Sequence, residues 1–313
     1  MKIKWRKFLK SSENNFAELK YLATVCSISL AVLLTAIKAV AAFMTGSLSI
    51  LSSLVDGLSD IVSSCISMIA VKYSDKPFTK RHRYGYGKAE SVSALVQAAF
   101  IVGSAGFILY DGIYRFIYPV QIKETALGIA VMVISLLLTC ALVIFQRYVI
   151  RITKSQAIAA DSLHYVVDIL SNSSVIVSLT VVRYLNWEWV DIVTAILISI
   201  YLIYNAWILT LEALEEITDK ELDDEVKNNI IQIIQSVDGI LGYHDLRTRV
   251  SGNHWFAEIH LEFDGNKTLT ETHALSDKAE NKIIAAYPQM QLIVHQDPFG
   301  LPENRIDHTL QDK

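Results

Sequence analysis

Six long apolar stretches constrain this chain more than any other feature of its sequence. They run over residues 19–44, 48–71, 90–118, 124–147, 156–183 and 189–211. Each reaches the roughly 20 residues that a helix needs to cross the hydrocarbon core of a bilayer. The composition agrees, because 52% of the residues are hydrophobic and only 19% are charged, a balance that is unusual for a soluble domain. The sequence therefore predicts a polytopic α-helical membrane protein with six transmembrane helices.

The distribution of lysine and arginine predicts the orientation of these helices. Basic residues gather before the first stretch and in the second-to-third and fourth-to-fifth connections, at Lys2, Lys4, Arg6, Lys7, Lys10, Lys20, Lys72, Lys76, Lys80, Arg81, Arg83, Lys88, Arg147, Arg151 and Lys154. The opposite connections carry little beyond Arg115, Lys123 and Arg183. By the positive-inside rule, we expect both termini in the cytoplasm.

The part of the chain after residue 211 has the charge density of a soluble domain. Helical periodicity over 221–237 and 269–286, and strand-like patterns over 243–251, 254–263 and 290–296, predict a small C-terminal cytoplasmic α/β domain of the metallochaperone kind, in the order α-β-β-α-β. Within 254–263, the apolar face is expected to carry Ala257, Ile259, Leu261 and Phe263, and the polar face Glu258, His260 and Glu262. We predict four segments: cytoplasmic 1–18, transmembrane 19–211, cytoplasmic domain 212–300 and tail 301–313.

Two pairs of potential metal ligands interrupt the apolar stretches: Asp56 with Asp60, and His164 with Asp168. Each pair has the spacing i, i+4, which puts both side chains on one face of a helix, one turn apart. A carboxylate at the bilayer centre costs roughly 2.5–3.5 kcal/mol, so such residues are functional by default. Counted from the outer edge, the first pair lies about 12 and 18 Å deep, and Asp168 and His164 about 15 and 21 Å. If the second and fifth helices pack together, Asp56 should face Asp168, and Asp60 should face His164.

Three carboxylates and one imidazole suit a divalent transition metal in tetrahedral coordination, zinc above all. Without a cation these carboxylates repel one another and hold protons, so metal and protons compete for them. A metal ion from the cytoplasm then displaces protons, and protons from outside displace the metal. This competition favours a secondary active transporter, not an enzyme, that exports zinc in exchange for protons. Iron(2+), cadmium and manganese accept similar donors and stay open as main substrates.

Two functions of other classes stay open at this point. A metal channel would conduct without a proton gradient, although no pore-lining ring or filter sequence is visible. A membrane-anchored metal sensor would use the helices only as an anchor and would not need the charged pairs. The glycines of Gly85-Tyr-Gly-Lys88 lack the spacing of a phosphate loop, which argues against nucleotide binding. The expected partners are membrane lipid and protons as counter-ion, with no nucleic acid.

Five motifs in order resemble the cation diffusion facilitator family, and most closely its bacterial ferrous-iron and zinc efflux pump subgroup. They are the two pairs above, His82-Arg-Tyr-Gly-Tyr-Gly-Lys-Ala-Glu90, His244-Asp-Leu-Arg-Thr-Arg249 and His295-Gln-Asp-Pro298. The resemblance covers about residues 15 to 300. It implies a homodimeric divalent-cation/proton antiporter in a bacterial inner membrane, with six spanning helices and a cytoplasmic domain that binds metal, regulates transport and dimerises.

The resemblance also implies roles for particular residues. It places the transport site on Asp56, Asp60, His164 and Asp168. In the cytoplasmic domain it implies a paired site for structural or regulatory Zn²⁺, with Fe²⁺ or Cd²⁺ as alternatives, built from His244, His260, His273, His295 and Asp297, of which Asp297 bridges two ions. Lys88 and Asp219 resemble the family's salt bridge between the membrane and cytoplasmic parts.

The loop between the second and third helices departs from the family pattern. The family's site there uses an aspartate and two histidines, and only His82 keeps its place, since Tyr86 and Thr79 stand at the other two positions. A single ligand makes a poor zinc site. We expect weak metal binding in this loop or none, with nearby Asp75 as a replacement ligand.

Overall fold

The structure is a computed structural model that describes residues 2–45, 48–117, 126–185 and 189–302, and positions 305, 307 and 309. Side chains are described within these ranges except at 2–15, 41, 42, 44, 45, 48–56, 115, 116, 126–132, 175–185, 190 and 191. The chain forms two compact units. The helical unit contains 12–77 and 88–214, and the sheet unit contains residues up to 11, 78–87 and those from 215 onward. The predicted segment boundaries at 18, 211 and 300 stay predictions.

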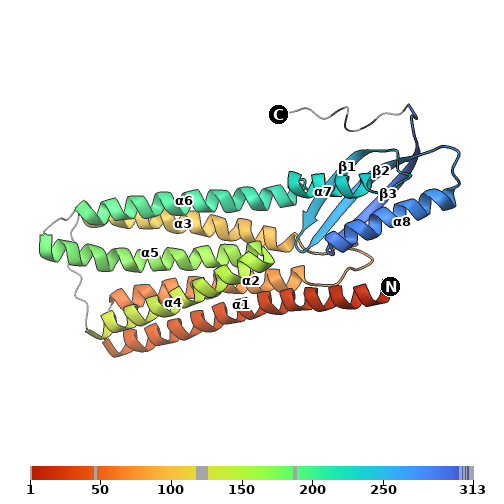
Figure 1. Ribbon diagram of the computed structural model, residues 1–313. Coiled ribbons are helices and arrows are strands. Elements are labelled where there is room, and N and C mark those ends of the chain that lie inside the picture. The colour runs from red at the N-terminus through yellow and green to blue at the C-terminus, as the bar shows by residue number, and fades with distance from the viewer. Residues whose placement is uncertain are drawn as a thin grey trace. The chain divides into compact units, whose positions relative to one another are not determined.

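Six long helices account for the predicted spans, one helix for each apolar stretch (Figure 1). They are α1 (Lys2–Thr45), α2 (Leu48–Ser74), α3 (Ala89–Ile117), α4 (Ala126–Thr153), α5 (Gln156–Leu185) and α6 (Trp189–Ile217). Several extend beyond the apolar stretch that predicts them; α1, for example, begins at Lys2 and therefore includes most of the predicted amino-terminal segment. Apolar length predicts the part of a helix that suits lipid, whereas the helix itself continues into polar sequence.

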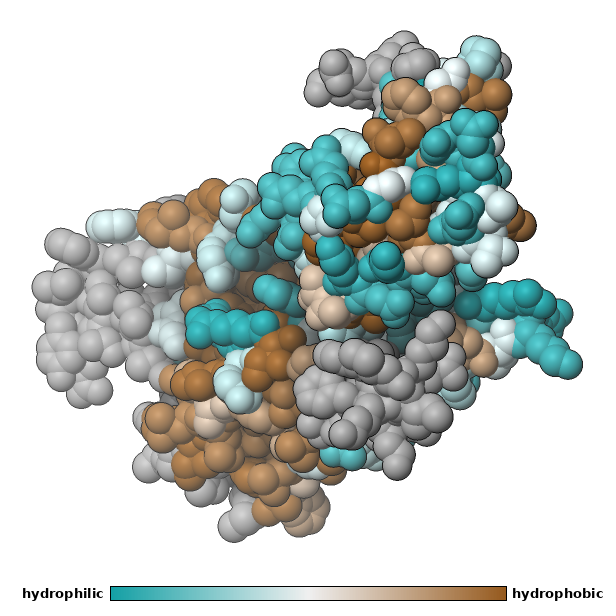
Figure 2. Space-filling view, turned by 45° about the vertical axis from the view of Figure 1, so that its right-hand side comes forward, coloured by the Kyte–Doolittle hydropathy of each residue, from teal (hydrophilic) through white to brown (hydrophobic). Residues whose placement is uncertain are grey.

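Four of these helices contain stretches that are long and apolar enough to cross a membrane: Phe16–Val40, Ala89–Tyr114, Val133–Thr153 and Ile192–Ile217. Over the residues described, α2 and α5 do not meet this measure, and these are the helices that carry the predicted charged pairs. Large apolar side chains such as Phe107 and Ile144 are exposed on the helical unit. Figure 2 shows hydrophobic surface gathered over these helices and hydrophilic surface over much of the sheet unit. Such exposure suits a lipid environment.

The helices of the helical unit pack through small side chains. Buried alanines on α3, α5 and α6, among them Ala98, Ala160 and Ala206, form one core cluster. Small residues allow helix backbones to approach closely, which is the usual mode of helix packing in membranes. Helix α2 packs directly against α5. This contact confirms the assumption on which the predicted pairing of charged residues depends.

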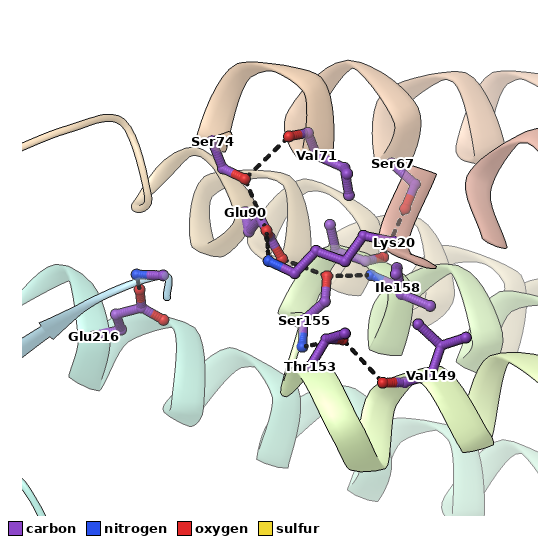
Figure 3. Close-up of polar contacts among 12 residues, drawn as sticks. Lys20, Ser67, Val71, Ser74, Glu90, Val149, Thr153, Ser155, Ile158 and Glu216 are labelled. Carbon is purple, nitrogen blue, oxygen red and sulfur yellow. Dashed lines mark hydrogen bonds and ion pairs between the residues drawn. The ribbon is translucent and has the colours of Figure 1, made fainter. Parts of the chain in front are cut away.

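A buried ion pair joins α1 to α3 within the helical unit. The Lys20 Nζ atom lies 2.7 Å from Glu90 Oε1, and both side chains are buried (Figure 3). Glu90 also accepts hydrogen bonds from the hydroxyls of Ser74, at the end of α2, and Ser155, just before α5. The charge pattern predicts Lys20 among the basic residues on the cytoplasmic side, but the structure places its side chain in the packed interior. Removing one partner of such a pair typically costs about 3–5 kcal/mol.

The sheet unit has the predicted order of helix, strand, strand, helix, strand. It contains α7 (Asp224–Gln235), β1 (Gly242–Ser251), β2 (His254–Phe263), α8 (Leu269–Ala286) and β3 (Met290–Pro298). Strand β2 is central, antiparallel to β1 and parallel to β3. Its predicted apolar residues are buried in the core with Ile230 and Ile234 of α7 and Ile283 of α8. Glu262, on the predicted polar face with His260, is buried as well.

Candidate metal centres

The structure brings together three of the four predicted transport residues, which we call the membrane group: Asp60 of α2 with His164 and Asp168 of α5. One possible ligand atom from each lies within 4.8 Å of the others. The His164 Nε2 atom is 3.2 Å from Asp60 Oδ1, and both side chains are buried. This agrees with the depth argument, which pairs these two residues. Asp56 belongs to α2, but its side chain lies outside the described residues.

The second nitrogen of the His164 ring is also informative. Its Nδ1 atom is buried and has no hydrogen-bond partner among the described residues. A buried polar atom without a partner costs free energy, so it is usually retained for a function. Together the membrane group offers an imidazole nitrogen and carboxylate oxygens, a donor set that fits a divalent transition metal ion.

A buried polar network that the sequence motifs do not predict adjoins the membrane group. Asp161 of α5 is 1% exposed and accepts hydrogen bonds from Ser64 Oγ (3.0 Å) and Gln146 Nε2 (2.8 Å). The Ser64 hydroxyl also contacts the Tyr165 hydroxyl at 2.8 Å. A signal for Asp161 was present in the sequence, because it precedes His164 by three residues and therefore lies on the same face of α5.

A second group of possible ligands lies across the three strands of the sheet unit, and we call it the sheet group: His244, His260 and Asp297. Their ligand atoms lie within 4.8 Å of one another. Strand register explains this arrangement, since His244 of β1 is paired with His260 of β2, which in turn is paired with His295 of β3. The His260 Nδ1 atom is 2.8 Å from Asp297 Oδ2, and His244 Nε2 is 3.7 Å from the same oxygen. Three histidines therefore form a row across the sheet, beside a buried carboxylate.

Two residues outside the predicted site support this row. Glu262 Oε1 lies 2.9 Å from His244 Nδ1, and Arg305 Nη2 contacts the same oxygen at 2.5 Å. A carboxylate on one ring nitrogen fixes the tautomer and orients the other nitrogen toward a metal. That other nitrogen, His244 Nε2, is buried and lies 3.7 Å from Asp297 Oδ2. The residues therefore fit a bound Zn²⁺, which would be held through His244, His260 and Asp297.

Known proteins resemble both the membrane part and the sheet part of this chain. Residues 24–218 match the family described as the cation efflux transmembrane domain, and residues 222–299 match the cation efflux protein, cytoplasmic domain. The chain belongs to the cation diffusion facilitator family. Cation-efflux pump FieF of Klebsiella pneumoniae is 41% identical over 279 residues, which cover 89% of this chain and 93% of that protein. FieF of Citrobacter koseri is 42% identical with the same coverage. A solved structure of CzrB is 33% identical, covers 25% of this chain and 99% of that one, and has a TM-score of 0.24.

Family membership makes the chain a multi-pass membrane protein of the cation efflux class.

Two further predicted ligands of the sheet unit, His295 and His273, lie at different distances from the sheet group. His295 Nε2 is 3.1 Å from Asp297 Oδ1, but its side chain is 64% exposed. His273 lies on α8, is 69% exposed and is 3.9 Å from Asp277. The structure therefore brings His295 to the edge of the sheet group and leaves His273 apart from it within one copy of the chain.

The loop that departs from the family pattern has a different set of contacts. The Thr79 hydroxyl lies 3.2 Å from the Tyr86 hydroxyl, and the His82 ring packs against the Tyr86 ring at 4.4 Å between centroids. Neither the membrane group nor the sheet group includes His82. The two substituted positions thus contact each other through hydroxyl groups.

Two further predictions concern contacts between units and stay predictions. Asp75 lies in the helical unit and His82 in the sheet unit; likewise Lys88 lies in the helical unit and Asp219 in the sheet unit. Within the sheet unit, Asp219 Oδ1 is 3.3 Å from Arg249 Nη1.

Proposed function

We propose that this chain exports a divalent transition metal ion, zinc first of all, from the cytoplasm in exchange for protons. The observation that carries the proposal is the membrane group, in which Asp60, His164 and Asp168 place ligand atoms within 4.8 Å of one another. Their helices, α2 and α5, belong to a multi-pass membrane protein of a cation efflux family. Acidic groups buried at this depth bind either a cation or protons, and that competition couples the two flows.

The choice of zinc depends on His164. An imidazole nitrogen is a better donor for zinc than for manganese, which prefers oxygen. Iron(2+) and cadmium accept a similar donor set. Replacing His164 with aspartate leaves only oxygen donors, and we expect the preference to move toward manganese by at least tenfold, on the order of 1.4 kcal/mol. Unchanged competition between zinc and manganese in that variant would remove the basis for ranking zinc first.

The sheet group has a separate role in the proposal. We infer that it binds Zn²⁺ that stays with the protein and regulates transport, and that the sheet unit joins two copies of the chain into a homodimer. The basic residues on one side of the helices support a cytoplasmic location for both termini, in a bacterial inner membrane. Zinc bound there would report the cytoplasmic metal level to the helices.

Reconstitution of the purified full-length protein in liposomes tests the proposal. A zinc-sensitive dye on the inside records metal flux with and without an imposed pH gradient. Flux that increases several-fold with a gradient supports antiport, flux that ignores the gradient indicates a channel, and absence of flux with zinc binding intact indicates a sensor. The His164→Ala variant is the matched control, because it should remove zinc flux while protein insertion and helix content stay unchanged.

A further inference from the structure

Asp161 differs from Glu90 in how its buried charge is balanced. Glu90 contacts Lys20 at 2.7 Å and accepts two hydroxyl hydrogen bonds. Asp161 accepts its hydrogen bonds from the neutral Ser64 and Gln146, and no lysine or arginine pairs with it in the described part of the chain. Burying an ionised carboxylate without a cation is far more costly than burying a neutral carboxylic acid. Asp161 can therefore exist with or without a proton, whereas Glu90 has a permanent cationic partner.

Gln146 provides a partner for each of these two states. Its Nε2 atom donates to Asp161 Oδ2 and to Ser27 Oγ, both at 2.8 Å. Its Oε1 atom is buried and has no hydrogen-bond partner among the residues described. A half-turn of the amide group would bring that oxygen toward Asp161. A protonated Asp161 can donate to it, whereas an ionised one can only accept, as from the Nε2 atom at 2.8 Å.

The position of Asp161 places it within electrostatic reach of the membrane group. It precedes His164 by three residues on α5, and its partner Ser64 follows Asp60 by four residues on α2. Asp161 thus lies about one helical turn from the predicted ligands, and its hydrogen bonds go to Ser64 and Gln146 instead of to a ligand.

Among the described residues, charged and titratable groups reach this network from α2 and α5. Asp60 of α2, and His164, Tyr165 and Asp168 of α5, are its neighbours. From α1 and α4, the network receives the neutral Ser27 and Gln146. The double charge of a metal ion one turn away would attract the carboxylate and repel its proton, and such interactions are weakly screened in a protein interior. Metal binding and protonation at Asp161 therefore oppose each other.

We propose that Asp161 carries a proton that is exchanged for the metal ion, an inference that rests on the antiport function above. When the membrane group faces the cytoplasm, metal binds, the O–H bond of Asp161 breaks and its proton leaves to cytoplasmic water. When the group faces the opposite side, the carboxylate takes a proton from that side, the new O–H bond donates to Gln146, and the metal leaves. Each cycle moves one proton inward through this residue as one metal ion moves outward.

The test compares wild type with Asp161→Asn in liposomes, using zinc as the metal, a zinc dye and a pH dye. Asparagine has the same shape but cannot exchange a proton. The variant should respond less to an inward proton gradient and move about one proton fewer per zinc ion, and Asp161→Glu should restore both. The matched control is Asp111→Asn, an aspartate of α3 outside the network, which should keep the wild-type ratio of protons to zinc.

The outcomes distinguish failure of the Asp161 proposal from failure of the antiport proposal. An Asp161→Asn protein with the wild-type ratio and gradient response overturns the role of Asp161. Wild-type zinc flux that ignores the gradient overturns antiport itself, whatever the variant does. If Asp161→Asn binds zinc but does not transport it, proton release on zinc addition in detergent decides: release equal to wild type contradicts the proposal, and release lower by about one proton supports it. If it does not fold, Gln146→Leu should shift the pH dependence of exchange, and an unchanged profile overturns the proposal.

Discussion

The two metal groups of this chain use similar side chains on very different scaffolds. In the membrane group, Asp60 and His164 come from two helices, α2 and α5, which pack together and share side-chain hydrogen bonds such as that of Ser64 with Asp161. In the sheet group, the ligands come from β1, β2 and β3, which are joined by backbone hydrogen bonds along their length. Packed helices can shift past one another, whereas separating strands breaks a hydrogen-bonded ladder. The helical scaffold therefore suits binding followed by release, and the sheet suits retention.

The surroundings of the two buried histidines show the same contrast. The ring of His244 is oriented by Glu262 at Nδ1, so its other nitrogen points at Asp297 before any metal arrives. The Nδ1 atom of His164 has no such partner among the described residues. Fixed ligands favour affinity because little ordering is needed on binding. A less constrained ligand favours exchange, which a transporter requires at every cycle.

Removal of a membrane ligand should have the largest effect, because a transition metal ion needs several donors and the membrane group brings together only three described side chains. We expect Asp60→Ala and His164→Ala each to lower zinc flux in liposomes by at least about 100-fold. Zinc bound by the sheet group, measured on the same preparation with a competing chelator, should change by less than twofold. Flux that survives either substitution would show that transport does not depend on the membrane group. The assignment of metal exchange to that group would then be wrong.

Removal of a sheet ligand should weaken retained zinc strongly and change zinc flux only slightly. We expect His260→Ala to weaken retained zinc by about 100-fold, measured in a His164→Ala background that removes binding at the membrane group. Flux at saturating zinc should fall by less than tenfold in the single variant. His82→Ala is the matched control, since its histidine belongs to neither group, and it should change neither quantity by more than twofold. A large effect of His82→Ala would show that the loop binds metal, contrary to the prediction based on Tyr86 and Thr79.

The fold was largely predictable from the sequence because its signals are local. Apolar length predicted the six helices. Alternation predicted β2, and helical periodicity predicted α8, both with the observed bounds. The spacing of His164 and Asp168 likewise needs only one helix. The opposition of Asp60 and His164 needed one assumption about packing, which the contact of α2 with α5 supplies.

The parts of the sites that sequence reasoning missed all depend on contacts between distant segments. Glu258 and Glu262 occupy the same alternating face of β2, yet only Glu262 is buried, because His244 and Arg305 contact it. The pattern of β2 alone cannot distinguish them. The buried pair of Lys20 with Glu90 joins residues 70 positions apart, so no periodicity within one helix could indicate it.

Glu262 sharpens the comparison, because it tests whether orientation of His244 matters to retention. Substitution of Glu262 with glutamine keeps a similar shape but removes the charge that holds the ring. We expect retained zinc to weaken by about 10- to 100-fold, less than for loss of a ligand, with flux unchanged within twofold. Arg305→Ala, which leaves the carboxylate in place, should produce a smaller change, and an equal or larger one would show that the arginine, not the glutamate, organises the site.

The smallest effect on zinc binding is expected from a substitution in α8, which packs beside the strands but contributes no ligand to the sheet group. Helix α8 begins with a capping box in which Thr268 and Glu271 hydrogen-bond to each other's backbone. The loss of this cap in Thr268→Ala should lower helix stability by about 1 kcal/mol, seen as faster amide hydrogen exchange in α8. If the strands alone hold the ligands, zinc affinity should stay within twofold; a larger change would mean that the sheet is not the rigid scaffold that retention requires.

The same cap has a pH dependence whose sign follows from its hydrogen bonds. The backbone N–H of Thr268, and then its side chain, hold the pKa of Glu271 below the ordinary value of 4.5. The stabilisation is therefore fully present above about pH 5 and is lost as pH falls through the lowered pKa. Exchange in α8 should differ between wild type and Glu271→Gln at neutral pH and converge as the pH falls through that lowered pKa, whereas Glu280→Gln on the same helix should show no such convergence. A difference that persists in acid would assign the cap's effect to shape instead of charge.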